Sequence, residues 1–258
     1  MKLFFFFCLF IFCLTAQENY EIQTYGSDTM DKGKTMIEIH SNFAFQGQKK
    51  TINGQRPTNH ALRETLEITH GFNDWFETGV YVFTSYNPGY GYQWVGDHIR
   101  PRVRIPEAWK WPVGLSLSGE FGYQRAYYSP DTWSIEIRPI VDKEIGRFYA
   151  SFNPTFGRSL HGPGVRDGFV FSPNFKTSVK TVKKAAFGFE YYGGLGTVGR
   201  FDPYIEQEHQ FIPTIDLDLG DKWEFNFGVG VGVTKNTEHL LVKMIIGRKV
   251  SFFSKKKN

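Results

Sequence analysis

Cysteine is nearly absent from this sequence of 258 residues. The only two, Cys8 and Cys13, lie in a short apolar run that follows the basic Lys2. A basic start, a short apolar run and a small residue before polar sequence are typical of a secretory signal peptide. We therefore expect residues 1–16 to be removed after Ala16, with an uncleaved anchor as the alternative. The mature chain would then contain no cysteine, which excludes disulfides and thiolate metal sites.

Long apolar runs and a large excess of charge are also missing. After residue 16 no apolar run reaches the ~20 residues of a transmembrane helix. The formal net charge of +4 is too small to indicate a nucleic acid or an anionic surface as a partner. Aromatic residues are by contrast abundant, at 17% with 26 phenylalanines, although the mean hydropathy is negative. A soluble domain would struggle to bury so many rings, and a helical membrane protein would not be this polar.

Apolar and polar residues alternate through most of the chain with a period of two, which predicts strands with one apolar face. In one example Trp223, Phe225, Phe227 and Val229 alternate with polar residues and glycine. The predicted strands cover residues 34–46, 61–72, 75–86, 93–105, 112–124, 132–142, 147–158, 166–180, 184–195, 209–219, 222–234 and 238–253. Most exceed the ~5 to 6 residues usual in soluble sheets and reach the ~9 to 11 that a tilted strand needs to cross a bilayer.

Short and long connections alternate between these strands, as in outer-membrane barrels. We predict an all-β fold, a transmembrane antiparallel up-and-down β-barrel of about 12 strands. The barrel would cover residues 34–253, after a periplasmic segment at 17–33 and before a basic tail at 254–258. The alternative is a secreted sandwich or a smaller soluble barrel.

Aromatic residues gather beside the short connections, which is typical of the girdle at a membrane boundary. These residues are Trp75, Phe76, Trp109, Trp111, Phe148 and Trp223. We therefore expect the bacterial outer membrane as the location and its lipid as a partner.

If the apolar faces meet lipid, the polar faces line the lumen. The lumen-lining or binding candidates are Glu38, His40, Arg63, Glu67, His98, Arg100, Arg102, Arg104, Glu120, Glu136, Arg138, Lys176, Glu190, Asp216, Glu224 and Lys243. Arginine on a lipid face at mid-depth costs ~2 to 4 kcal/mol, so the cations at every second position of 98–104 must point inward. We expect them to meet carboxylates such as Glu120 and Glu136. The charges either orient a passing solute or form ion pairs that fill a closed barrel.

Five predicted strands share the pattern of an apolar residue, any residue, proline, any residue and an apolar residue. The prolines are Pro101, Pro139, Pro154, Pro173 and Pro213. Proline has no N–H for the ladder, so these positions are either bulges or places where the strand assignment is wrong. In each strand the proline lies at an even spacing from the apolar residues, so it shares the lipid-facing side with them. This favours a role in shaping the wall.

Signals for catalysis are weak. His70, His161, Ser159, Asp97 and His98 could serve a hydrolase, but none lies in a motif that activates a nucleophile. We find no spacing typical of metal ligands and expect neither a metal nor another cofactor. The prediction is a protein without enzymatic activity, with a barrel-embedded hydrolase as a lesser alternative.

The alternating strands, the turn-side tryptophans, the glycine-rich strand at 225–234 and the final hairpin resemble outer-membrane β-barrels of Gram-negative bacteria. Among these are transporters of the meta-pathway phenol-degradation type. The resemblance implies transport of a small hydrophobic or aromatic molecule across the outer membrane. We predict a passive channel or transporter, monomeric or weakly oligomeric, that does not bind nucleic acid. A structural or adhesion barrel with a closed lumen is the alternative.

Overall fold

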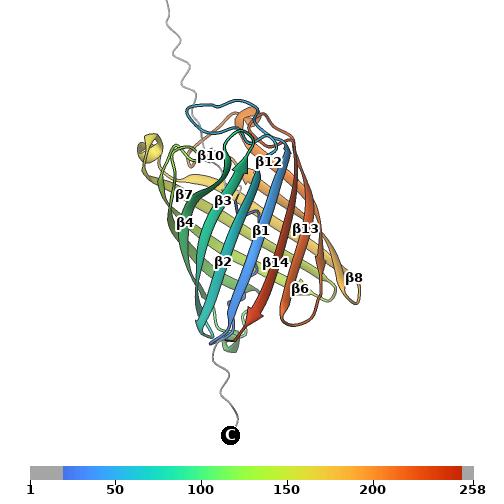
Figure 1. Ribbon diagram of the computed structural model, residues 1–258. Helices are drawn as coiled ribbons and strands as arrows, with labels where there is room; N and C mark the ends of the chain where they lie inside the picture. Colours follow the sequence, from blue (N-terminus) through green and yellow to red (C-terminus); the bar gives the residue numbers. More distant parts are fainter. Residues whose placement is uncertain (1–19, 252–258) are drawn as a thin grey trace, which may run out of the picture.

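The computed structural model describes residues 20–251, so the expected signal peptide, its cleavage after Ala16 and the basic tail lie outside the described residues. Twelve long strands form a closed antiparallel up-and-down barrel (Figure 1), which confirms the predicted fold class. They are β1 (Thr35–Gln46), β2 (Leu62–Asn73), β3 (Phe76–Asn87), β4 (Gly91–Arg104), β5 (Gly114–Gln124), β6 (Trp133–Ile145), β7 (Phe148–His161), β8 (Val170–Val182), β9 (Ala185–Gly194), β12 (Glu208–Leu217), β13 (Trp223–Gly232) and β14 (Leu240–Val250).

Each long strand pairs with the next long strand, and β1 pairs with β14 to close the barrel. The two-residue strands β10 (Gly196–Thr197) and β11 (Arg200–Phe201) form a small hairpin between β9 and β12. Three 3₁₀ turns complete the structure: η1 (Glu107–Trp109), η2 (Pro163–Arg166) and η3 (Tyr204–Glu206). Because η2 and the connection after it extend to residue 169, the strand predicted at 166–180 begins only at Val170. In the part of the chain from residue 20 to residue 251, no helix is long and apolar enough to cross a membrane.

The two faces of the wall differ as the period of two predicts. Apolar side chains such as Ile39, Val80 and Ile99 are 45 to 47% exposed on the outside. Polar residues of the same wall, such as His40 on β1 and Thr65 on β2, are fully buried inside. This inverted distribution suits a wall in contact with lipid.

Aromatic side chains border the apolar band at both ends of the barrel. At the short turns Trp75, Trp109, Trp111, Phe148 and Trp223 are exposed, as the sequence predicts. At the long loops Tyr90, Tyr92, Trp94, Tyr127 and Trp133 are exposed as well. Rings at both boundaries are typical of barrels whose middle lies in hydrocarbon.

The five prolines lie inside regular strands, so the strand assignment at those positions is confirmed and the bulge hypothesis is wrong. The pairing of β4 with β5 keeps one register across Pro101, from Ile99 opposite Phe121 to Arg102 opposite Ser118. Register shifts occur elsewhere, as at Phe83 in β3. Each proline instead leaves a local gap in hydrogen bonding, because it has no N–H to donate.

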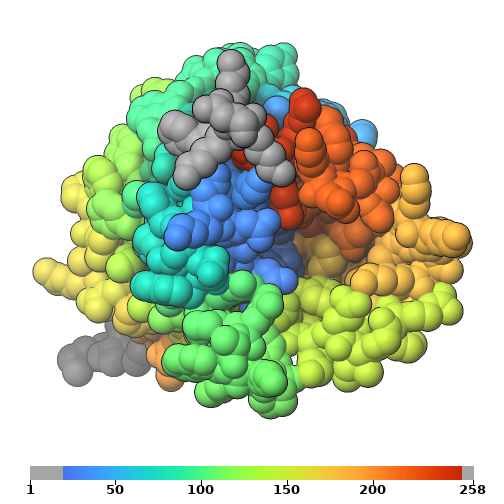
Figure 2. Space-filling view, turned by 90° about the horizontal axis from the view of Figure 1, so that it is seen from below, coloured from blue at the N-terminus to red at the C-terminus, as the bar shows by residue number. Residues whose placement is uncertain are grey.

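The segment before β1 is the main departure from expectation. Residues 17–33 were expected to lie in the periplasm, but residues 20–31 run inside the barrel against inward-facing side chains. We call residues 20–31 the luminal segment. Seen into the short-turn end, blue residues near the start of the described chain occupy the middle of the opening, with a hollow beside them (Figure 2). The physical reason is that the polar inner wall offers this segment many hydrogen-bonding partners.

Candidate functional site

The candidate site is the lumen, and the sequence-predicted lumen residues all lie on the inward face of the wall. Most are buried, and Arg104, Glu136, Lys176, Asp216 and Glu224 are half-buried. Alternation along each strand places these residues inside, because successive side chains point to opposite faces. Whether they bind a solute stays a prediction.

The cations of β4 each find a carboxylate. Arg100 lies 2.7 Å from Glu67 and 3.0 Å from Glu77, and Arg102 lies 2.6 Å from the same Glu77. His98 lies 2.5 Å from Glu120, which is one of the two partners expected from the sequence. The two central arginines therefore pair towards β2 and β3, and only His98 pairs towards β5.

A neighbouring pair continues this charged wall. Arg138 on β6 lies 2.5 Å from Glu136 and 3.9 Å from Glu120. Glu136 is thus paired within its own strand and not with β4. Since Glu120 also faces His98, these residues form an ion-pair network from β4 to β6, next to the network of Arg100 and Arg102 from β2 to β4.

A second charged group lies on β8, β9, β12 and β14. Lys176 is 3.2 Å from Glu190 and 2.8 Å from Asp216. Lys243 also pairs with Glu190 and donates to the carbonyl of Ile22 in the luminal segment. Opposite charges are therefore matched around most of the inner wall, so the lumen is strongly polar without carrying one sign of charge.

Tyr25 is the centre of the luminal segment. Its ring lies 4.9 Å from the guanidinium of Arg100, 5.5 Å from that of Arg102 and 5.0 Å from that of Arg138. We call these three residues the arginine cluster. A cation over an aromatic face is attracted by the ring quadrupole, more strongly where water is excluded.

The backbone of the luminal segment is bound on several sides. Asn153 of β7 accepts a hydrogen bond from the N–H of Tyr25 at 2.8 Å and donates one to its carbonyl at 3.0 Å. Ser151 donates to the same carbonyl at 2.6 Å. Asp142 accepts from both the backbone and the hydroxyl of Ser27.

Further contacts lie at the two ends of the luminal segment. The carbonyl of Tyr20 accepts hydrogen bonds from Asn42 and Thr65, and the N–H of Met30 donates to Glu77 at 2.5 Å. These partners belong to β1, β2 and β3. Since β6 and β7 hold the middle of the segment, it is fixed across the width of the lumen.

A cavity of about 320 Å³ remains between the luminal segment and the wall. Thr29 and Met30 line it from the segment, and Glu38, Glu67 and Glu224 line it from the wall. Met36 near the start of β1 and Lys249 near the end of β14 also line it, so the cavity lies in the half of the lumen close to the short turns. The cavity is the hollow seen beside the segment in Figure 2.

The residues considered for a hydrolase are not brought together with a base and an orienting group. His161 contacts Thr132 at 2.8 Å, and His70 contacts Thr35 at 2.8 Å. Asp97 accepts from the ring of Trp94, and His98 belongs to the ion-pair network. Nothing in this arrangement favours nucleophilic chemistry.

No family model matches the sequence, and no curated protein matches it. Solved structures that share its fold include two porins. The KdgM porin is 11% identical with a TM-score of 0.51, and the match covers 84% of this chain and 99% of the porin. The NanC porin is 6% identical with a TM-score of 0.55, and the match covers 84% of this chain and 100% of the porin. The chain therefore has a porin-like fold, and the expected likeness to phenol-degradation transporters stays a prediction.

Among the lumen residues that the sequence analysis missed are two charged ones. Glu77 binds both central arginines, and Glu238, in the connection between β13 and β14, lies 2.5 Å from Arg63. Glu77 was hidden because the inward face of β3 also carries Tyr81 and Phe83, so neither face looks polar. Glu77 lies an even number of positions from Gly79 and Ser85, so these three residues share one face, and this could have shown that Glu77 points inward. Glu238 was predicted to begin the strand at 238–253, but β14 begins only at Leu240, so Glu238 lies in the loop before it, where alternation gives no information.

Proposed function

We propose that this protein is a passive channel for small polar solutes in the bacterial outer membrane. The apolar outer band with aromatic residues at both ends supports the membrane location. The fold likeness to the KdgM and NanC porins supports a channel, because both of those proteins are porins.

The observation that carries the proposal is the polar cavity beside the luminal segment. Several buried side-chain atoms around the lumen, among them Oε1 of Glu38, Nε of Arg102 and Oδ1 of Asn226, have no hydrogen-bonding partner in the described protein. Buried polar groups in a roomy polar site are normally satisfied by water. A wet lumen with matched charges favours hydrophilic solutes over the hydrophobic or aromatic molecule that the family resemblance implies.

The luminal segment supplies the closed state of this channel. Its contacts to the wall are mainly hydrogen bonds, which net only about 0.5 to 1.5 kcal/mol each, and cation–ring contacts. Tyr20 and Ile22 add apolar packing near one end of the segment, and Asp28 adds one exposed ion pair near the other. It belongs to no sheet, so it can move without breaking a strand pair. We infer that solute passes when the segment shifts or leaves the lumen.

A closed structural barrel remains the second candidate, and one observation favours it. The luminal segment touches strands on several sides of the lumen, from β1 to β7 and at β14. In that case the segment and the ion pairs would serve only to fill the interior.

Deleting residues 20–31 separates the two candidates. The bonds of Gly33 and Lys34 to Gly71 remain in this variant, so β1 keeps its pairing with β2. We expect liposomes containing the deleted chain to swell faster than wild-type liposomes in small sugars and amino acids. Heat-dependent gel mobility in detergent serves as the folding control. A folded variant without flux for any solute would establish the closed structural barrel.

A further inference from the structure

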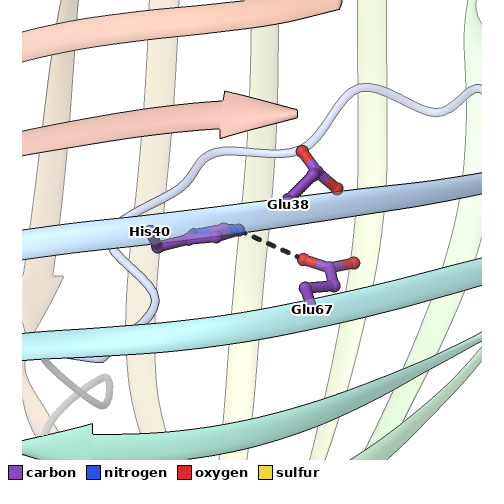
Figure 3. A group of neighbouring side chains, drawn as sticks. All are labelled: Glu38, His40 and Glu67. Atoms are coloured by element: carbon purple, nitrogen blue, oxygen red, sulfur yellow. Dashed lines mark ion pairs between the residues drawn. The ribbon is translucent and has the colours of Figure 1, made fainter. Parts of the chain in front are cut away.

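Three side chains on the inward face of β1 and β2 form a compact group of ligand atoms. Glu38 and His40 are two positions apart on β1, so both point into the lumen. Glu67 on β2 lies directly opposite Glu38 in the ladder. One ligand atom of each residue lies within 4.8 Å of the others. Figure 3 shows the three side chains on neighbouring strands, with the ion pair between His40 and Glu67 marked.

The hydrogen-bonding capacity of the group is largely unused. Glu38 is 6% exposed and His40 is fully buried. Oε1 of Glu38 and both ring nitrogens of His40 have no hydrogen-bonding partner in the described protein. Nε2 of His40 lies 3.3 Å from Oε2 of Glu67, and that oxygen has no other partner. Buried polar atoms are rarely left in this condition.

The charges next to the group leave the carboxylate of Glu38 without a cationic partner among the described residues. Arg100 and Arg102 are matched by Glu67 and Glu77. Glu38 adds a third buried carboxylate, and no lysine or arginine of residues 20–251 forms an ion pair with it. A buried carboxylate without a partner is costly, so a cation that binds it gains stability.

We propose that Glu38, His40 and Glu67 bind one divalent transition-metal ion of the zinc type. One imidazole nitrogen and two carboxylate oxygens are a ligand set that zinc accepts, and they leave a position for water. Tetrahedral ligands at about 2.1 Å from zinc lie about 3.4 Å apart, close to the separation of His40 and Glu67. The carboxylate of Glu38 needs to shift by at most about 1.4 Å, and no other hydrogen bond holds its Oε1.

The ion can reach this site from the lumen. Glu38 and Glu67 line the cavity of about 320 Å³, so water or a solute in the cavity can occupy the open coordination position. Oε1 of Glu67 stays bound to Arg100, which orients its Oε2 towards His40. Such support from a neighbouring group is usual around metal ligands. The site does not depend on whether the lumen conducts.

Metal titration of the folded protein tests the proposal. The untagged mature chain in detergent is treated with chelator, then titrated with Zn²⁺ by calorimetry and with Co²⁺ by visible absorption. We expect one ion per chain. His40→Gln and Glu38→Gln should each weaken binding about 100-fold or more, since loss of a supporting neighbour alone costs about 10- to 100-fold. His98→Gln is the matched control, because His98 also faces a buried glutamate but has no third ligand.

Absence of stoichiometric binding by the wild type would overturn the proposal, and so would equal affinity in the His40→Gln variant. If either variant fails to fold, X-ray absorption of the zinc-loaded wild type gives the answer. One imidazole nitrogen with otherwise oxygen ligands is expected. Two or more imidazoles, or a sulfur ligand, would place the ion elsewhere and overturn the assignment.

Discussion

Replacing Arg100 with methionine should lower the free energy of unfolding by about 3 to 5 kcal/mol, because it removes one partner of a buried ion pair. The guanidinium contacts Glu67, Glu77 and Thr69 and also donates to Tyr81. Methionine fills similar space but leaves both carboxylates buried with less positive charge nearby. Urea unfolding in detergent with chelator present, followed by tryptophan fluorescence, measures the loss.

Arg104→Met is the matched control on the same strand. Arg104 reaches Asp28 at 2.9 Å and Glu107 at 3.4 Å, but these carboxylates are 85% and 83% exposed. Exposed ion pairs contribute about 0 to 1 kcal/mol, so this variant should unfold close to the wild type. Equal losses in the two variants would show that the pairing of Arg100 does not matter for stability.

Replacing Asn153 with leucine should release the luminal segment more often. The substitution removes two hydrogen bonds to Tyr25, which together contribute about 1 to 3 kcal/mol. At about 1.4 kcal/mol for each factor of ten, the open population should rise about 5- to 150-fold. Current recordings in planar bilayers should therefore show more frequent openings.

The control for this variant is Asn174→Leu. Asn174 lies directly opposite Asn153 on β8, is equally buried, and donates to Thr155 and not to the luminal segment. The same change of side chain at the same level should leave the opening frequency near that of the wild type. If both variants open equally often, the contacts to Tyr25 do not control the lumen.

The strands could be predicted because each one carries its own signal. Alternation fixes which side chains share a face, and it placed His98 and the arginines of β4 inside the barrel. Strand length and the alternation of short and long connections were enough to predict closure and strand number. The prediction of bulges at Pro101 and the other strand prolines was wrong. A proline removes one N–H donor from the ladder, but this does not require an extra residue in the strand.

The contents of the lumen could not be predicted in the same way. The luminal segment has no periodic pattern, and its position depends on side chains that are distant in sequence, such as Asn153 and Lys243. Ion-pair partners depend on register and curvature, so alternation could not show that Arg100 turns towards Glu67. The sequence analysis predicted that Glu38, His40 and Glu67 each face the lumen. It could not predict that they lie close together, because this depends on how β1 pairs with β2.

A reversible lock on the luminal segment tests the central claim, that this segment closes a channel. A Cβ placed on Gly114 would lie 3.1 Å from the Cβ of Ser27. Disulfides need about 3.5 to 4.5 Å between these atoms, so the luminal segment would have to move away from β5 by roughly half an ångström. The Asp142 carboxylate would have to turn aside. The pair Ser27→Cys and Gly114→Cys is built on Asn153→Leu, with Cys8 and Cys13 removed or replaced by serine. Single-channel current should be suppressed when the pair is oxidised and should return with reductant. Current that is the same before and after reduction of a formed disulfide would contradict the account.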